Sequence, residues 1–368
     1  MEDWTKQGRP DYRARRYLSA GEAARYLGTT VEEVHRLVRE SRIPVQMASS
    51  GQQRFDLAKL KPFASIRSEA DLGRRSRIGI DGTVQEVICD DASSMEDLDD
   101  DSVHLMVTSP PYFNTKMYSP APLDGDLGNV HSMDEWFRRI AVVWKETFRV
   151  LQPGRKAFIN LMNLPLRLDG GSYRTLNLTG RTVDMCEDIG FVFKRDIVWH
   201  KTNGVRAPFG TYPFPGGILL NNMHEFILEL EKPPRGREPK YAHVSPEDRE
   251  ASRLDRDFWL SIKSSDVWLM NPEGSGDRRD HVAPFPVELP SRLIRAFSYR
   301  RETVLDPFCG NGTALVAAAR LGRNGIGYEI VPGIAAGAVG RLENERRAFI
   351  EKAEDQGSRR EDVERCAL

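Results

Sequence analysis

The sequence predicts an α/β protein whose main domain is a doubly wound, mostly parallel sheet, preceded by a small helical module. Short apolar runs alternate with amphipathic helical stretches over most of residues 80–341. Residues 203–280 interrupt this alternation, because they are rich in proline, glycine and charge. The first 80 residues are rich in arginine, and an acidic stretch follows at residues 90–101. This asymmetry indicates a basic module attached to a near-neutral body.

These changes in composition divide the 368 residues into four parts. We predict a helical module at residues 1–65, a linker at 66–79, the main domain at 80–342 and a polar tail at 343–368. The formal net charge is -1, and no apolar run reaches the length of a membrane span. The four cysteines are far apart and form no Cys-x-x-Cys pair, so we expect neither a metal site nor a disulfide framework. The chain shows no signal peptide, and we therefore expect a cytoplasmic protein that contacts no membrane.

The module at residues 1–65 has the pattern of a helix-turn-helix followed by a hairpin wing. Ser19 can cap a first helix, which Gly28 ends in a tight turn. A second helix is expected at residues 31–40, and residues 43–55 predict the hairpin. This stretch resembles the winged helix-turn-helix domains of the MerR and excisionase family, which implies contact with DNA. A helical hairpin that only packs on the main domain is the alternative. The arginines expected to contact DNA are Arg36, Arg39 and Arg54.

In the main domain, two local patterns are especially informative. Residues 103–107 are apolar except for His104, as is typical of a strand buried on both faces of a parallel sheet. Ser132 and Glu135 form a capping box at the start of a strongly amphipathic helix. The elements expected around these two are strands at 82–89, 157–161 and 191–199 and a helix at 178–189. Together they indicate a Rossmann-like sheet.

The first chemical motif, Thr108-Ser109-Pro110-Pro111-Tyr112, directly follows the strand at 103–107. Proline lacks an N–H, so the backbone is rigid here and its carbonyl oxygens are fixed acceptors. An exocyclic base amine is a poor nucleophile because its lone pair is delocalised into the ring. If the Ser109 side chain and the Pro110 carbonyl accepted both amine hydrogens, the nitrogen would become more tetrahedral and more nucleophilic. The ring of Tyr112 could stack on an extruded base, although a structural turn would also fit these residues.

The second motif is a glycine loop between an apolar strand and a helix, at residues 304–313. Gly310 and Gly312 let the backbone approach a ligand closely. The next strand ends at Glu329, about 20 residues after the loop, where a carboxylate would meet ribose hydroxyls. The loop lacks Gly-Lys-Ser/Thr for a triphosphate, and Asp306 would repel a phosphate but attract the ammonium group of an amino acid. A ligand that contains both a ribose and an amino acid is S-adenosylmethionine.

In this order the two motifs resemble the circularly permuted beta group of DNA amino-methyltransferases. Further similarity lies at residues 149–154, 197–201, 224–225 and 281–286. The resemblance spans roughly residues 80–342. It implies S-adenosylmethionine as the cofactor, a Rossmann-like sheet of the methyltransferase type, and a target-recognition region at residues 203–280.

The resemblance also assigns roles to residues and partners. Double-stranded DNA is the implied substrate, with the target base flipped out of the duplex. A homodimer and a cognate restriction endonuclease are further partners that the resemblance allows. Phe308 is expected to flank the adenine of the cofactor, and Asn311 stands where serine is common. The catalytic residues expected are Ser109, Pro110, Pro111 and Tyr112, and the cofactor-binding residues are Asp306, Pro307, Phe308, Gly310, Asn311, Gly312, Thr313 and Glu329.

Ser109 favours cytosine N4 as the methyl acceptor, because family members that act on adenine usually have Asp or Asn before the two prolines. Adenine N6, methylated by the same mechanism, is the main alternative.

Three other classes of protein are alternatives. A carbon-5 cytosine methyltransferase is rejected, because it needs a cysteine on its target-base loop, whereas Cys309 lies in the cofactor loop. Amino-methyltransferases of RNA or of protein glutamine are disfavoured, because they more often have Asn-Pro-Pro or Asp-Pro-Pro than Ser-Pro-Pro. A MerR-like regulator with an inactive methyltransferase domain is the alternative from another class, and the intact Asp306 and Glu329 argue against it.

Overall fold

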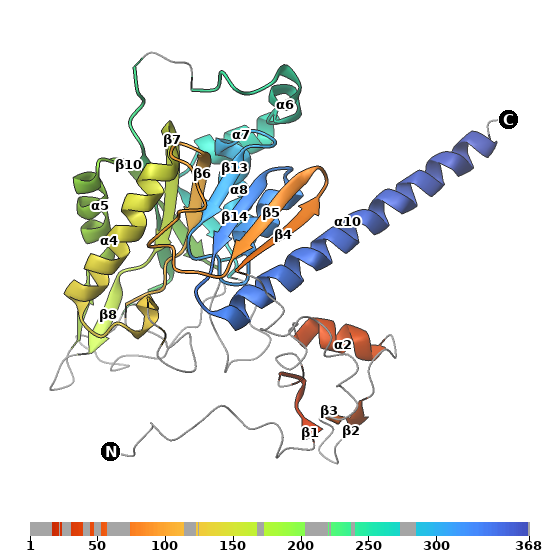
Figure 1. Cartoon of the computed structure of the whole chain (residues 1–368), viewed down its shortest axis with the longest axis horizontal. Helices are drawn as coiled ribbons and strands as arrows, with labels where there is room; N and C mark the ends of the chain where they lie inside the picture. Colours follow the sequence, from red (N-terminus) through yellow and green to blue (C-terminus); the bar gives the residue numbers. More distant parts are fainter. Residues whose placement is uncertain are drawn as a thin grey trace.

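The main domain has three layers in the computed structural model, with helices on both faces of one nine-stranded sheet (Figure 1). The strands, in their order across the sheet, are β12 (Val267–Met270), β10 (Val192–Lys201), β11 (His224–Glu231), β7 (Leu151–Leu161), β6 (Val103–Thr108), β13 (Thr303–Asp306), β14 (Asn324–Tyr328), β5 (Thr83–Ile88) and β4 (Arg75–Ile80). All of them except β4 and β11 run in the same direction. The prediction of a doubly wound, mostly parallel sheet is therefore confirmed. The structure describes residues 17–21, 23, 31–39, 45–47, 53–56, 74–113, 123, 125–167, 173–202, 220, 222–236, 240–272 and 285–366.

The helices divide between the two faces of the sheet. One face is covered by α4 (Met133–Val150) and α5 (Leu178–Ile189), and the other by α8 (Glu288–Phe297), α9 (Thr313–Arg320) and α10 (Pro332–Cys366). The connections contain η5 (Leu127–Asn129), α6 (Pro246–Ala251), α7 (Arg256–Lys263) and a hairpin of β8 (Leu164–Arg167) and β9 (Tyr173–Leu176). The C-terminal part of α10 extends away from the body (Figure 1). Within the described residues, no helix is both long enough and apolar enough to span a membrane.

Two of the strongest local predictions are confirmed. In β6, Met106 packs on the face of α4, whereas Leu105 and Val107 pack on the face of α8, so the strand is buried on both sides. The side chain of Ser132 caps α4 by accepting from the N–H of Glu135 at 3.4 Å. These elements form where predicted because, for each segment, only one type of secondary structure buries its apolar side chains.

Part of the predicted linker at residues 66–79 is instead a sheet strand, because β4 begins at Arg75 and pairs antiparallel with β5. Its side chains alternate, with Ile78 and Ile80 buried and the arginines exposed. Arg77 contacts Glu86 on the neighbouring strand at 3.1 Å. The arginines that suggested a linker are thus the outward face of an edge strand.

The predicted target-recognition region at residues 203–280 also contributes to the core. Both β11 and β12 lie within it, and Ile227, Leu228 and Trp268 are buried. The sequence pattern obscured these strands, because glutamates alternate with apolar side chains in β11. Target recognition by this region stays a prediction.

The described part of the N-terminal module contains α2 (Val31–Arg39) and three short strands, β1 (Tyr17–Leu18), β2 (Gln46–Met47) and β3 (Gln53–Asp56). Strand β3 pairs antiparallel with both β1 and β2, and Leu18, Val34 and Phe55 are fully buried. The second helix and the hairpin lie where we predicted them. Most of the first predicted helix falls outside the described residues, so the winged helix-turn-helix stays a prediction.

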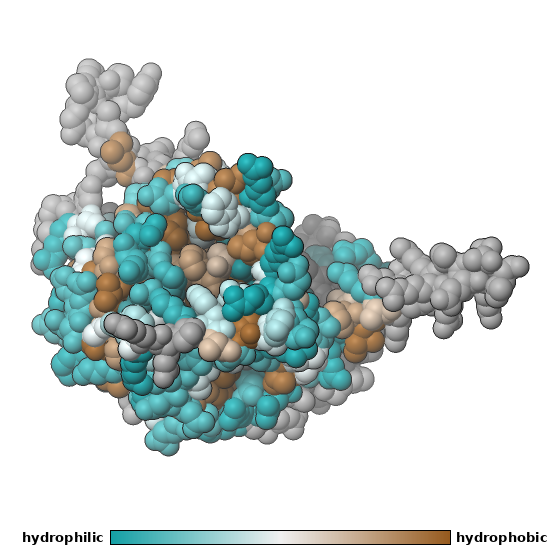
Figure 2. Space-filling model, turned by 90° about the horizontal axis from the view of Figure 1, so that it is seen from above, coloured by the Kyte–Doolittle hydropathy of each residue, from teal (hydrophilic) through white to brown (hydrophobic). Residues whose placement is uncertain are grey.

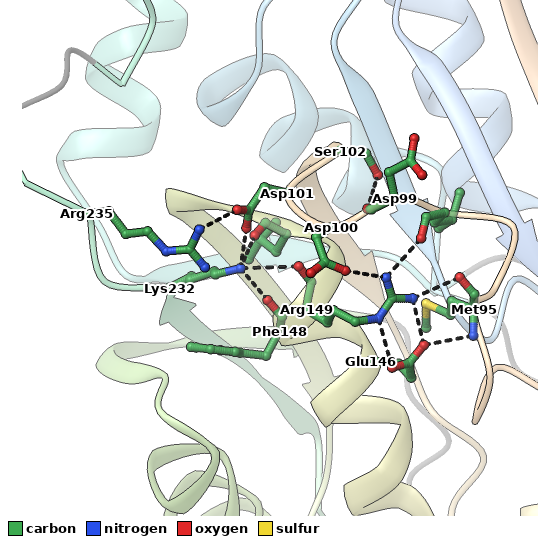
Figure 3. Close-up of polar contacts among 12 residues, drawn as sticks. Met95, Asp99, Asp100, Asp101, Ser102, Glu146, Phe148, Arg149, Lys232 and Arg235 are labelled. Atoms are coloured by element: carbon green, nitrogen blue, oxygen red, sulfur yellow. Dashed lines mark hydrogen bonds and ion pairs between the residues drawn. The ribbon is translucent and has the colours of Figure 1, made fainter.

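At the amino edge of the sheet, a buried lysine joins α4 to two strands. Lys232 follows β11, and its side chain is only 4% exposed. Its ammonium group donates to the carbonyls of Phe148 and Leu151 at 2.6 Å each, and to Asp101 at 2.6 Å (Figure 3). A cation at this position complements the negative end of the helix dipole and satisfies carbonyls that the last helical turn leaves unpaired. Asp101 also accepts from the exposed Arg235.

A second buried ion pair, Arg155–Glu302, lies at the same edge, and both side chains are almost inaccessible. Seen from above in Figure 2, the surface on this side is mainly hydrophilic and is interrupted by scattered apolar patches. The charged groups beneath it have protein partners, which indicates that they stabilise the fold at this edge.

We predict that Lys232→Met lowers the free energy of unfolding by about 3 kcal/mol, because the helix carbonyls and Asp101 lose a buried partner. Arg235→Met is the matched control, since it removes a largely exposed partner of the same carboxylate and should cost less than about 1 kcal/mol. Urea denaturation of the three proteins measures both values. Equal losses in the two variants would contradict this role of Lys232.

Candidate active site

The two predicted motifs meet at the carboxyl edge of the sheet. Strands β6 and β13 are parallel neighbours, with Met106 opposite Leu305. Their last residues, Thr108 and Asp306, are joined by a hydrogen bond of 2.6 Å from the threonine hydroxyl to the carboxylate. The loop at 109–113 and the glycine loop therefore leave the sheet side by side, as the carboxyl end of a parallel sheet requires for a ligand site.

The glycine loop is tightly fixed by backbone contacts. Gly310 and Gly312 have φ values of 50° and 74°, in the left-handed region that favours glycine. The N–H of Cys309 donates to the carbonyl of Tyr328 at 2.8 Å, which ties the loop to β14. A Cβ at Gly310 would meet no atom within 4 Å, so the backbone there is open to a ligand. Helix α9 starts directly after the loop, at Thr313.

The two acidic residues of the motif lie under this loop and hydrogen-bond to it. Asp306 is 2% exposed and accepts from the N–H of Phe308 at 3.1 Å, in addition to Thr108. Glu329 accepts from the N–H groups of Gly310 at 3.1 Å and Val331 at 2.8 Å. Burial raises the pKa of Asp306 to about 7 and the pKa of Glu329 to about 7, and in each case these hydrogen bonds oppose the shift. Both groups can therefore change charge near neutral pH.

The remaining predicted residues of the cofactor loop occupy different depths. Pro307, Gly312 and Thr313 are buried, whereas Asn311 is exposed. Phe308 is partly buried, and its ring meets Trp144 of α4 edge-on, with centroids 5.9 Å apart. The sequence analysis did not identify Trp144.

In the proline motif, Pro110 is buried, whereas Ser109, Pro111 and Tyr112 are partly exposed. The hydroxyl of Tyr112 donates to the carboxylate of Glu225 at 3.0 Å. Sequence reasoning assigned no role to Glu225. The similarity at residues 224–225 was the available signal, but the partner of Glu225 lies 113 positions away in the chain.

The residues predicted to bind DNA are only partly described. Arg39, at the end of α2, and Arg54, on β3, are exposed. The side chain of Arg36 lies outside the described residues. The exposure of Arg39 and Arg54 is compatible with DNA contact and does not test it.

One cluster in the described part of the chain has the residue types of a metal site: His104, His243 and Glu302, whose ligand atoms lie within 4.8 Å of one another. It lies at the amino edge, away from both motifs. The Nδ1 of His104 accepts from the N–H of Thr303 at 3.1 Å, and burial lowers the pKa of His104 to about 4. The neutral ring thus carries its proton on Nε2, which is then not free to bind a cation. Glu302 is already paired with Arg155, so the cluster is a structural network.

Comparison with known proteins agrees with this geometry. A protein-family model described as DNA methylase matches residues 103–339. The type II methyltransferase M.MjaI of Methanocaldococcus jannaschii is 33% identical over an alignment of 281 residues that covers 67% of this chain and 88% of the relative. M.Cfr9I of Citrobacter freundii is 27% identical over 280 residues, covering 70% of this chain and 86% of the relative.

Solved structures show the same fold. The putative DNA modification methylase TTHA0409 of Thermus thermophilus, complexed with S-adenosyl-L-methionine, is 33% identical with a TM-score of 0.54. The match covers 70% of this chain and 95% of that one. The cytosine-N4-specific PvuII DNA methyltransferase has a TM-score of 0.51 at 17% identity, over 73% of this chain and 93% of that one, and supports the fold only.

The raised pKa of Asp306 makes a prediction about stability. A carboxyl group whose pKa is higher in the folded than in the unfolded state destabilises the fold increasingly as pH rises from about 4 to about 7. Asp306→Asn keeps an oxygen that can accept from Thr108 and Phe308 but cannot ionise. We expect it to be more stable than the wild type by roughly 4 kcal/mol at pH 8, and to show most of this gain lost at pH 4.

Urea denaturation of both proteins at the two pH values measures this difference. Glu329 is present in both, but the charge of Asp306 contributes to its raised pKa, so the substitution also relieves Glu329 and adds to the gain at high pH. A stability difference that does not change between pH 4 and pH 8 would contradict the burial of an ionising Asp306.

Proposed function

The chain belongs to the DNA methylase family of N6 and N4 amino-methyltransferases, and from this premise we propose that it transfers the methyl group of S-adenosylmethionine to cytosine N4 in duplex DNA. The observation that carries the proposal is the hydrogen bond from Thr108 to Asp306, which joins the start of the target-amine motif to the start of the cofactor loop. A methyl donor and a base amine can react only if both are held at one edge of the sheet.

The glycine loop and its acids fit S-adenosylmethionine. The open backbone at Gly310 allows close approach, and Glu329 lies beside it at the end of β14, where ribose hydroxyls would bind. The cofactor is cationic at its sulfonium and ammonium groups, so it would favour the ionised forms of Asp306 and Glu329. The complex of the T. thermophilus relative with this cofactor supports the assignment. Pro307, Phe308, Asn311, Gly312 and Thr313 complete the proposed cofactor loop.

When bound, the cofactor supplies an electrophilic methyl group on a sulfonium. Ser109 and the Pro110 carbonyl accept the two hydrogens of the base amine and direct its lone pair toward that methyl group. The methyl group would pass from sulfur to this nitrogen, and the electron pair of the broken sulfur–carbon bond would stay on sulfur. The nitrogen then loses one proton to solvent. Pro111 keeps this backbone rigid, and the ring of Tyr112 stacks on the flipped base.

We favour cytosine N4 over adenine N6 because family members that act on adenine usually have Asp or Asn at the position of Ser109, whereas those that act on cytosine usually have Ser. An inactive methyltransferase domain on a DNA-binding regulator is the alternative of another class. The buried Asp306 argues against it, because an ionisable group in that position destabilises a fold that has no use for it.

We predict that cells that express the chain produce plasmid DNA that contains N4-methylcytosine. The measurement is digestion of this DNA to nucleosides followed by mass spectrometry. The Ser109→Ala variant is the control, because it leaves the cofactor loop intact and should lower methylation while S-adenosylmethionine binds normally. N6-methyladenine without N4-methylcytosine would overturn the choice of base and leave the mechanism standing. DNA without either product would contradict the proposed function.

We further propose that residues 1–65 add DNA affinity through Arg36, Arg39 and Arg54, chiefly by contacts to phosphates. Because phosphate contacts release counterions, a chain without residues 1–65 should bind plasmid DNA more weakly and with a smaller dependence on salt. Three phosphate contacts would reduce the slope of log K against log salt by about 3. Fluorescence anisotropy at several salt concentrations measures the slopes, and equal slopes would show that this module does not contact DNA.

A further inference from the structure

A network of three polar residues converges behind the ring of Tyr112, and the mechanism above does not use it. The Oε2 atom of Glu225 accepts from the hydroxyl of Tyr112 at 3.0 Å and from the side-chain amide of Asn160 at 2.6 Å. Its Oε1 atom contacts the ammonium group of Lys201 at 2.5 Å. One carboxylate therefore receives three donors.

The sheet brings these residues together at the carboxyl edge. Thr108 of β6 is opposite Ile159 of β7, so Asn160 lies next to the start of the proline motif. Strand β11 is antiparallel to both β7 and β10, so its second residue, Glu225, lies at the edge where β10 ends with Lys201. The network thus links three strands to the loop that carries Tyr112.

The network surrounds the side chain of Glu225 with donors. Glu225 is 6% exposed, and its partners are the ammonium group of Lys201, the amide of Asn160 and the hydroxyl of Tyr112. A hydrogen bond to a charged acceptor is stronger than one to a neutral acceptor, and burial limits its screening by water. The contact from Tyr112 is therefore a strong restraint on that side chain.

Asn160 shows that the network has a cost. Its amide nitrogen must face Glu225, because only the nitrogen can donate to the carboxylate. Its Oδ1 atom is then buried without a hydrogen-bond partner among the described residues. An unsatisfied buried carbonyl destabilises the fold, which indicates that the amide is placed for Glu225 rather than for stability.

We propose that Glu225 is a positioning residue that fixes the ring plane of Tyr112 for the target base, with Asn160 and Lys201 holding Glu225 in place. This inference rests on the proposed role of Tyr112. A phenol ring turns readily about its terminal torsion, and its hydroxyl oxygen lies on the axis of that rotation. Because the phenolic O–H prefers to lie in the plane of the ring, a hydrogen bond to an acceptor at a fixed position favours one ring plane. A ring of fixed orientation aligns the stacked base, and with it the amine, before methyl transfer.

The test compares Tyr112→Phe, Glu225→Gln and the double variant. Phe keeps the ring and loses the hydroxyl, whereas Gln offers one acceptor oxygen to three donors. The control is Glu229→Gln, because Glu229 is another buried carboxylate on β11, paired with Lys156 and Arg195 away from the motif. For each protein, kcat and KM are measured with unmethylated plasmid DNA and methyl-labelled S-adenosylmethionine, and cofactor affinity is measured by calorimetry.

Each single variant should lower kcat roughly tenfold or more, the loss expected for a hydrogen bond to a charged group. Cofactor affinity should stay near the wild-type value. The double variant should be no slower than the slower single variant, because both changes remove the same contact. Glu229→Gln should retain the wild-type kcat.

A wild-type kcat in Tyr112→Phe would overturn the proposal, even if Glu225→Gln failed to fold. Losses that multiply in the double variant would also overturn it, since they would indicate two independent roles. Tyr112→Ala separates this inference from the proposed function on which it rests. If Tyr112→Ala is impaired and Tyr112→Phe is not, only the positioning role fails. If Tyr112→Ala is also fully active, the assignment of Tyr112 to the target base fails.

Discussion

The hydrogen bond between Thr108 and Asp306 spans 198 positions of the chain and joins the ends of the central strands β6 and β13 at the carboxyl edge of the sheet. Both chemical motifs start from it, because the proline motif follows Thr108 directly and the glycine loop follows Asp306. The contact requires β6 and β13 to be parallel neighbours, which in turn requires the order of strands around them. Asp306 is buried for this purpose although burial raises its pKa to about 7, so the geometry of the site is held at the expense of stability at neutral pH.

The two edges of the sheet therefore have different tasks. At the amino edge, Lys232 and the Arg155–Glu302 pair satisfy helix and strand ends with buried charges. At the carboxyl edge, Asp306 and Asn160 are buried in ways that do not stabilise the fold. Stabilising groups at one edge can offset this cost without contacting the site. The separation also explains why the histidine cluster near Glu302 is structural although its residue types suit a metal.

The sequence predicted what local patterns determine, such as β6 and the start of α4. It also predicted that the two motifs act together in one site, because each follows a buried strand. It missed β4, where alternating arginines on an edge strand read as a linker. It also missed the role of Glu225, because the partners of that carboxylate come from β7, β10 and the loop after β6. Contacts between distant segments depend on strand order, which no local pattern records.

The order of the motifs along the chain matters little to such a site, because the edge collects residues from strands wherever they occur in the sequence. Tyr112 and Asp306 come from neighbouring strands, and Glu225 comes from a strand that the chain forms between them. The antiparallel direction of β11 is what brings its first residues, rather than its last, to the carboxyl edge. Because β11 is reversed in a mostly parallel sheet, it places the carboxylate of Glu225 at the carboxyl edge, beside Tyr112. The other end of β11 leads to Lys232 at the opposite edge. One strand thus connects the group proposed to orient Tyr112 with the group that holds α4.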